Sequence, residues 1–306
     1  FALRAGEVLG LVGESGCGKS TLGRGLMGLT PRGAAVDGDI SFDGVDLLQL
    51  PRKERDRLRG GGMGLIFQEP MTRLDPLMKI SDHFDESLKV HAPDLKKAGR
   101  KARALEALRA LGIPPTRYEN YPHEFSGGMR QRIMIALALA LRPKFIVADE
   151  PTTALDVLVE AQILRILADI RAQFHPAILL ITHNLGIVAE ACDRVAVMYA
   201  GRIVEQGPVR DIFASPQHPY TQALLRSTIS LTTQELHSIP GAPPDLVRPP
   251  AGCRFHPRCD YAMQICAAEL PPPMGEHRTE CWLLDPVDDI SRRPLLRQEV
   301  SVADEA

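Results

Sequence analysis

The run of sequence that decides the fold is Gly13-Glu14-Ser15-Gly16-Cys17-Gly18-Lys19-Ser20-Thr21. It matches the phosphate-loop pattern G-x-x-x-x-G-K-[ST] and lies between an apolar run at residues 8–12 and a segment with helical spacing. Glycines allow consecutive backbone N–H groups to turn toward an anion, and the helix N-terminus adds partial positive charge. The run therefore predicts a phosphate-binding loop, in which Lys19 reaches the outer phosphates and Ser20 binds magnesium.

The bulk composition is ordinary for a globular chain and limits the classes of function. With 306 residues, the chain is long enough for one large domain or two smaller ones. The formal net charge of -2 gives no electrostatic footprint for nucleic acid, so we expect no DNA or RNA partner. The longest apolar run, 133–141, is far shorter than the roughly 20 residues that cross a bilayer. Any role at a membrane would therefore come through a partner.

The chain begins at Phe1, with neither a methionine nor a signal peptide. We therefore expect a truncated or mis-started N-terminus and a cytoplasmic protein, in which the six cysteines stay reduced. Of these cysteines, Cys17 in the phosphate loop and Cys192 in a predicted helix are expected to have no metal or redox role.

Alternating strands and helices predict an α/β fold with a mainly parallel sheet covered on both faces. The predicted strands include residues 63–67, 144–149, 177–182 and 194–199. Helical periodicity dominates about 71–142, whereas the sequence beyond 207 is rich in proline and loops and holds four of the six cysteines. We predict a first domain over 1–208, with a helical subdomain at about 71–142, and a C-terminal extension over 209–306.

An acidic pair, Asp149 and Glu150, follows the predicted strand that ends at residue 149. At a strand end that faces a phosphate loop, Asp149 can hold magnesium through water, and Glu150 can act as the base for the attacking water. On its own, such a pair is more often part of a solvated loop. The phosphate loop upstream favours the catalytic interpretation.

A second candidate anion site is Ser126-Gly127-Gly128, which stands at the start of another predicted helix. One nucleotide needs a single phosphate loop, so a second site suggests a nucleotide sandwiched between two subunits. The simpler alternative is a capped helix with a flexible lead-in. His183 follows the predicted strand 177–182, where a lone histidine is more often structural than catalytic.

Six segments together resemble, in order, the motifs of an ABC-type nucleotide-binding domain. Gly13 to Thr21 match the Walker A loop, Gln68 the Q-loop, and Ser126 to Gln131 the signature. Phe145 to Glu150 match the Walker B strand, Ala154-Leu155-Asp156 the D-loop, and His183 the switch histidine. The resemblance implies a P-loop NTPase fold of the ABC type, with a helical subdomain and a loop-rich, cysteine-containing extension. It also implies that two such domains dimerise head to tail, so that the signature serine and glycines of one cover the γ-phosphate held by the other.

The same resemblance implies roles for single residues. The phosphates of ATP would be bound by Lys19 and the loop amides. The residues around Mg²⁺ would be Ser20, Gln68 and Asp149. The hydrolytic residues would be Glu150, His183, Gln68 and Lys19. Asp156 would act across the dimer.

Longer stretches narrow the resemblance to the oligopeptide/dipeptide/nickel importer ATPases. These stretches are Gly13 to Lys19, Phe67 to Met71, Tyr121 to Arg132 and His218-Pro219-Tyr220. The last is also compatible with a simple helix start, with Pro219 in the first turn. One departure concerns the aromatic residue that stacks on adenine in this family. Only Phe1 to Gly6 precede the first strand, and no position there matches that aromatic residue.

Four cysteines in the extension, Cys253, Cys259, Cys266 and Cys281, suggest a metal centre, because disulfides would be reduced in the cytoplasm. Their spacing is not the paired C-x-x-C of a zinc ribbon. Several members of the resembled family hold a [4Fe-4S] cluster at four cysteines here, and ligation by four thiolates suits that cluster. We expect a [4Fe-4S] cluster, with zinc and free thiols as the alternatives.

The resemblance implies the ATPase subunit of an importer for peptides or similar small solutes, at the cytoplasmic face of the plasma membrane. It would pair with a second ATPase subunit, identical or different, and work with two transmembrane permease subunits and an extracytoplasmic solute-binding protein. One alternative is a soluble ABC ATPase of DNA repair or translation, which would need a coiled-coil insertion or a second cassette. Another is a regulatory iron–sulfur nucleotide-binding module, which would predict loss of Glu150 or His183. The sequence does not identify the solute.

Overall fold

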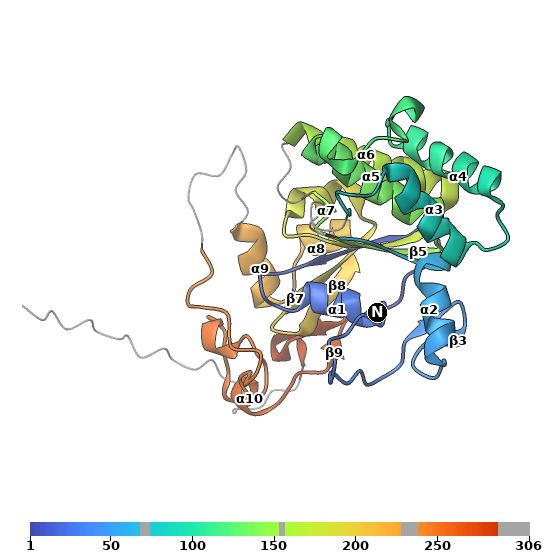
Figure 1. Ribbon diagram of the computed structural model, residues 1–306. Coiled ribbons are helices and arrows are strands. Elements are labelled where there is room, and N and C mark those ends of the chain that lie inside the picture. Colours follow the sequence, from blue (N-terminus) through green and yellow to red (C-terminus); the bar gives the residue numbers. More distant parts are fainter. Residues whose placement is uncertain (68–73, 153–156, 228–237, 287–306) are drawn as a thin grey trace, which may run out of the picture. The chain divides into compact units, whose positions relative to one another are not determined.

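The computed structural model describes residues 1–67, 74–152, 157–227 and 238–286 (Figure 1). Contacts divide the chain into two compact units. The first unit contains residues 1–12 and 18–194, and the second contains residues 13–17 and 195–306. The division falls inside the predicted phosphate loop, whose first five residues belong to the same unit as the C-terminal part of the chain.

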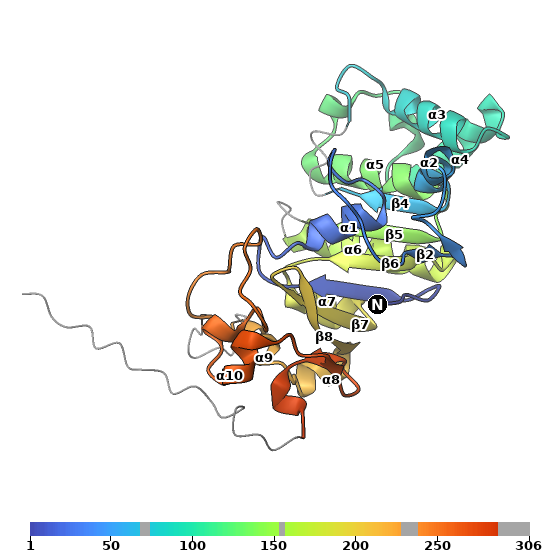
Figure 2. The ribbon, with the colours of Figure 1, turned by 90° about the horizontal axis from the view of Figure 1, so that it is seen from below.

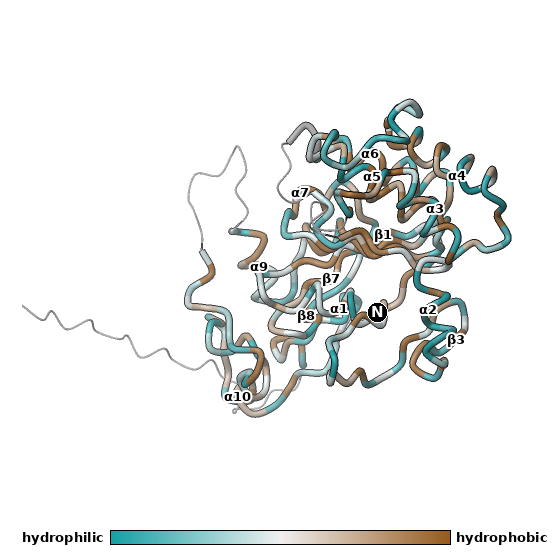
Figure 3. The backbone as a smooth tube through the Cα atoms, viewed as in Figure 1, coloured by the Kyte–Doolittle hydropathy of each residue, from teal (hydrophilic) through white to brown (hydrophobic). Residues whose placement is uncertain are grey.

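A parallel sheet forms the centre of the first unit. Its strands, in spatial order, are β4 (Met63–Ile66), β5 (Phe145–Asp149), β6 (Ala177–Ile181) and β1 (Val8–Val12). Every residue of β1 and β6 is buried, which explains why these segments are continuous apolar runs rather than alternating ones. The brown band along β1 in Figure 3 shows this apolar character. The predicted strands of this unit are therefore confirmed.

Helices and short elements surround this sheet. They are α1 (Lys19–Leu26), the hairpin β2 (Ser41–Phe42) and β3 (Val45–Asp46), α2 (Arg52–Gly61), α3 (Ile80–His91), α4 (Lys97–Ala110), η2 (Pro115–Arg117), η3 (Pro122–Glu124), α5 (Gly127–Ala140), α6 (Val157–Phe174) and α7 (Leu185–Ala191). Figure 2 shows α3, α4 and α5 grouped together, and α5 also contacts β4. The helical segment predicted between β4 and β5 is thus present, with Phe84, Leu108 and Ile133 fully buried in its core.

The described part of the second unit combines short helices and strands with long loops. Its elements are β7 (Arg194–Tyr199), whose first residue belongs to the first unit, β8 (Arg202–Pro208), α8 (Val209–Ala214), α9 (Pro219–Arg226), η4 (His256–Arg258), α10 (Gln264–Ala268), the hairpin β9 (Pro273–Met274) and β10 (Thr279–Glu280), and η5 (Trp282–Leu284). Three aromatic rings form the centre of its core: Tyr199 lies 4.6 Å from Tyr220 and 5.1 Å from Phe255, measured between ring centroids. Burial of these rings supplies the apolar contact that the proline-rich sequence does not suggest. Among the described residues of the whole chain, no helix combines the length and apolar character needed to span a bilayer.

The segment His218-Pro219-Tyr220 begins α9, as the simpler interpretation predicted. The Nδ1 atom of His218 accepts a hydrogen bond of 3.0 Å from the Tyr220 N–H, and Pro219 occupies the first turn. The carboxylate of the buried Glu205 accepts the N–H groups of Gln217 and His218 at 2.7 and 3.0 Å. Burial lowers the pKa of His218 to about 3, so the imidazole stays neutral in the folded protein.

Stability should therefore fall in acid through His218. Above about pH 6.5 the imidazole is neutral in both states; below it, only the unfolded chain takes up the proton. The free energy of unfolding should then drop by about 1.4 kcal/mol for each pH unit between about 6.5 and 3, relative to a His218→Asn variant that keeps a capping acceptor. Urea denaturation at about pH 7.5 and about pH 5 measures this difference. Equal pH dependence of the two proteins would show that His218 is not the buried neutral group described.

Candidate functional site

The candidate site of the first unit lies at the carboxyl edge of its sheet. Because the strands are parallel, the residues that follow β1, β5 and β6 all emerge at this edge. Lys19 is the first residue of α1, Asp149 ends β5, and His183 follows β6. Segments far apart in the sequence therefore contribute to one edge, as the strand-end positions predicted.

The two predicted magnesium residues of this unit are in direct contact. The Ser20 hydroxyl donates a hydrogen bond of 2.8 Å to Oδ1 of Asp149. Burial raises the pKa of Asp149, whereas the hydrogen bond from Ser20 acts in the opposite direction. Hydroxyl and carboxylate oxygens are the ligands that Mg²⁺ prefers, so this pair fits the ion. The buried ammonium of Lys19 adds positive charge next to Ser20 in the chain.

Glu150 and His183 also come together. Oε1 of Glu150 lies 3.5 Å from Nδ1 of His183, and the two side chains are 18% and 62% exposed. Glu150 has a φ of 45°, a left-handed conformation that is unfavourable for a residue with a side chain. Its N–H donates to the Ile181 carbonyl at 2.9 Å, which holds the strained backbone in place. A partly exposed carboxylate beside an imidazole is suited to orienting and deprotonating a water molecule.

The first half of the phosphate loop belongs to the second unit. A Cβ atom on Gly13 would lie 2.1 Å from the Met198 carbonyl oxygen, so this position requires glycine. The Cys17 carbonyl accepts a hydrogen bond of 2.8 Å from the N–H of Gly201. The Cys17 side chain is buried, which is consistent with a packing role. The N–H of Glu14 donates to the Tyr220 hydroxyl at 2.9 Å. These contacts fix the backbone of residues 13–17 from within the second unit.

The signature segment caps α5. Oγ of Ser126 accepts the Met129 N–H at 3.4 Å, and both Ser126 and Gly127 are exposed. The buried Gln131 donates from Nε2 to the Pro151 carbonyl at 2.7 Å, which ties this helix to the segment after β5. The capped-helix interpretation is thus confirmed locally. Coverage of a nucleotide in a second subunit stays a prediction, as do Gln68 and Asp156, which lie outside the described residues.

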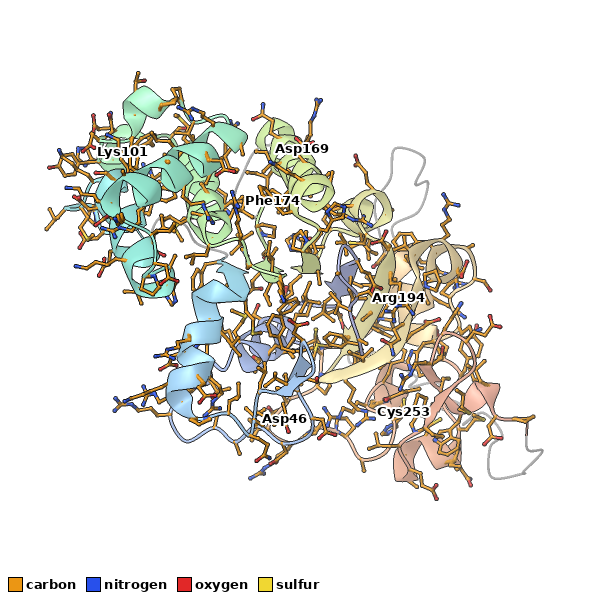
Figure 4. All side chains as sticks on the ribbon, turned by 90° about the vertical axis from the view of Figure 1, so that its right-hand side faces the viewer. Asp46, Lys101, Asp169, Phe174, Arg194 and Cys253 are labelled. Atoms are coloured by element: carbon orange, nitrogen blue, oxygen red, sulfur yellow. The ribbon has the colours of Figure 1, made fainter. Side chains whose placement is uncertain are left out.

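The metal centre predicted at four cysteines is not supported. Within the described part of the chain, which includes all four, no group of three or more His, Cys, Asp or Glu side chains could hold a metal ion. Burial, together with a smaller contribution from neighbouring thiols, raises the pKa of Cys253 and Cys259 to about 11 and that of Cys281 to about 12. Burial thus disfavours the thiolate form of these cysteines. Figure 4 marks Cys253 in the second unit.

Sequence reasoning missed two residues that contact the phosphate loop, Tyr220 and Arg258. Tyr220 lies in the segment quoted for its family resemblance, but its contact with Glu14 spans 206 positions. The guanidinium of Arg258 forms an ion pair with the Glu14 carboxylate at 2.7 Å. The family-like segment His218-Pro219-Tyr220 was the available signal for Tyr220; for Arg258 the sequence offers none.

Residues 1–153 match the family described as ABC transporter, and residues 204–266 match the family described as oligopeptide/dipeptide transporter, C-terminal region. The chain belongs to the ABC transporter family. Its predicted ABC-type P-loop fold is thereby confirmed.

Relatives of this ABC chain carry transport names. It is 49% identical over 270 residues to the oligopeptide transport ATP-binding protein OppD of Salmonella typhimurium, covering 87% of this chain and 80% of that protein. It is 49% identical to OppD of Bacillus subtilis, with coverage of 94% and 82%. It is 47% identical to the dipeptide transport ATP-binding protein DppD of Bacillus subtilis, with coverage of 93% and 88%.

Solved structures give the same fold. A dimeric post-hydrolysis state of the ATP-binding cassette MJ0796, bound to ADP and Pi, matches with a TM-score of 0.61 and 26% identity, covering 69% of this chain and 88% of that one. The protein cbiO1 of Clostridium perfringens, part of the transporter complex cbiONQ, matches with a TM-score of 0.61 and 29% identity, with coverage of 70% and 82%.

The contact between Ser20 and Asp149 leads to a prediction for magnesium. Ser20→Ala removes one oxygen ligand, so the Mg²⁺ concentration for half-maximal ATP hydrolysis should rise by at least about tenfold. Ser20→Thr keeps the hydroxyl and should stay within a few-fold of the unchanged protein. Initial rates of phosphate release against free Mg²⁺ measure both. A Ser20→Ala protein with an unchanged magnesium titration would remove Ser20 from the metal site.

Proposed function

We propose that this chain is the ATP-hydrolysing subunit that powers import of di- or oligopeptides, or similar small solutes, through a membrane ABC transporter. The observation that carries the ATPase part is the pairing of Glu150 with His183 at the sheet edge that also bears Ser20 and Asp149. The names of the relatives, oligopeptide and dipeptide transport ATP-binding proteins, support the solute class. The match to the C-terminal region of such transporters supports it independently.

Each residue has a defined task in this proposal. Lys19 and the amides of the phosphate loop hold the phosphates of ATP, and Ser20 and Asp149 hold Mg²⁺, together with Gln68. Magnesium, when bound, neutralises charge on the phosphates. Glu150 accepts the proton of the attacking water, and His183 orients that water or the phosphate it attacks.

The alternatives have less support. The relatives OppD and DppD are named for peptide transport, which favours a transport subunit over a soluble ABC ATPase of DNA repair or translation. A regulatory module with incidental nucleotide binding would not need Glu150 in a strained conformation beside His183. Hydrolysis coupled to transport therefore accounts for more of the observations.

The partners follow from the same proposal. A second ATPase subunit, identical or different, places its signature on the nucleotide; the exposure of Ser126 and Gly127 and the dimeric MJ0796 cassette support this arrangement. Two permease subunits carry the solute across the membrane, and an extracytoplasmic binding protein delivers it. The chain then lies at the cytoplasmic face of the membrane as a peripheral subunit.

We also propose the domain boundaries predicted from the sequence, 1–208 for the nucleotide-binding domain and 209–306 for the extension. The C-terminal family match, which begins at residue 204, supports a boundary close to 208. Contacts instead group residues 195–208 with the extension. The proposed boundary thus assigns β7 and β8 to the nucleotide-binding domain, whereas the contacts group them with the extension.

The [4Fe-4S] cluster stays a prediction that rests on the resemblance and on four neighbouring thiols. If it is present, protein purified without oxygen should be brown, and the visible absorbance should bleach on reduction. Cys259→Ser should remove the colour, whereas Cys192→Ser, outside the group, should keep it. A colourless protein with one bound zinc would show that the site holds zinc instead of the cluster. A colourless, metal-free protein would show that the four cysteines are free thiols.

Glu150→Gln tests the function as a whole. The amide cannot accept a proton, so ATP turnover should fall by about 100-fold or more while ATP still binds. The ATP-bound dimer should accumulate, as size-exclusion chromatography with ATP would show. Cells in which this variant replaces the native chain should lose uptake of a labelled tripeptide.

Asp169→Asn is the matched control. Asp169 is an exposed acid on α6, labelled in Figure 4, and its substitution should change neither turnover nor uptake. Unaltered turnover in Glu150→Gln would refute the assignment of the base. Lost turnover with normal peptide uptake would refute the import function.

A further inference from the structure

The side chain of Arg258 reaches the phosphate loop from the C-terminal part of the second unit. Its two terminal nitrogens, Nη1 and Nη2, lie 2.7 and 3.0 Å from Oε2 and Oε1 of Glu14. Arg258 is only 6% exposed and Glu14 is 22% exposed, so water screens this pair little. The geometry is the two-pronged arrangement in which arginine binds a carboxylate most strongly.

All five N–H donors of the Arg258 guanidinium have acceptors. Besides the two bonds to Glu14, Nε donates to the Pro240 carbonyl at 2.7 Å. Nη1 also donates to the Tyr199 hydroxyl and Nη2 to the Ile239 carbonyl, both at 3.3 Å. The guanidinium is therefore fixed in position and orientation before any ligand binds, and a lysine could not make the same set of bonds.

Glu14 has a second anchor in the same unit. Its N–H donates to the Tyr220 hydroxyl at 2.9 Å, and the fully buried Tyr220 ring packs against Tyr199 and Phe255. The backbone and the side chain of one loop residue are thus held by two residues more than 200 positions away. Such a double hold limits both the position and the rotation of this residue.

The charge of Glu14 explains why its contact with Arg258 matters for ligand binding. Glu14 places a carboxylate inside a loop whose ligand is a polyphosphate, and like charges at close range repel strongly when they are shielded from water. A cation bonded to both carboxylate oxygens offsets that charge. Without Arg258, the Glu14 carboxylate would lose both of these charged hydrogen bonds.

We propose that Arg258, with Tyr220, is a positioning residue for ATP binding: it neutralises Glu14 and holds the first half of the phosphate loop from the C-terminal part of the chain. Neither residue needs to touch the nucleotide. The proposal rests on the proposed ATPase function and adds that the C-terminal region is required for the affinity of the loop. The step it affects is binding, because the pair is formed before ATP arrives.

A double-mutant cycle on the full chain tests the proposal. Arg258→Met should raise KM for ATP by about tenfold and change kcat little, because binding is lost rather than chemistry. Adding Glu14→Gln removes the carboxylate charge next to the ligand and should restore most of the lost affinity. A side chain with only a structural role would lower the melting temperature and leave KM for ATP unchanged. Arg202→Met is the control, since it breaks a two-pronged pair with Glu280 in the same unit that does not involve the loop.

Tyr220→Phe provides a second measurement that keeps the ring and removes only the hydroxyl. It should raise KM for ATP severalfold at an unchanged melting temperature, and it decides the outcome if Arg258→Met does not fold. An unchanged KM in both variants, or a raised KM in Arg258→Met that Glu14→Gln does not relieve, would overturn the proposal. Absence of ATP hydrolysis by the protein without any substitution would instead refute the proposed function. Failure of the proposed function and failure of this inference are therefore distinguishable.

Discussion

Parallel pairing of β5 with β6 and of β6 with β1 is the constraint on which the site depends. In this register Asp149 lies beside Ile181, and Leu11 lies beside the same residue on the other side. Strands β1, β5 and β6 therefore end side by side at one edge of the sheet. The residues that follow them are brought together by this pairing, although they are far apart in the sequence. Burial of β1 and β6 on both faces fixes this register, because a slip would break the apolar packing of both.

The same packing sustains the strain at Glu150. A left-handed backbone at a glutamate costs on the order of 1–3 kcal/mol, and it persists only where surrounding contacts determine it. Here the N–H bond to Ile181 ties the residue to the neighbouring strand. The Glu150 carboxylate lies 3.5 Å from Nδ1 of His183 in this conformation. The packing of the sheet thus fixes the backbone conformation that positions the Glu150 carboxylate.

Much of this arrangement could be predicted from the sequence, because it depends on local patterns. Apolar runs located the strands, the glycine-rich run located the phosphate loop, and strand-end acids located Asp149 and Glu150. The pair of Arg258 and Glu14 could not be predicted, since 244 positions separate them and neither residue type is unusual where it stands. The cysteine spacing suggested a metal centre, but spacing carries no distance between sulfur atoms, and the described geometry did not support one. Gln68 and Asp156 lie outside the described residues, so their predicted roles stay predictions.

The grouping of residues 13–17 with the C-terminal part of the chain bears on how such proteins can be recombined. The extension is not a module that can be cut off or exchanged at one junction, because part of its core belongs to a loop near the start of the chain. A chimaera that takes its extension from a relative would have to match Glu14 to the incoming residues at positions 220 and 258. Substitutions at these distant positions would be tolerated together more readily than singly, and an inherited change at one end would favour a compensating change at the other.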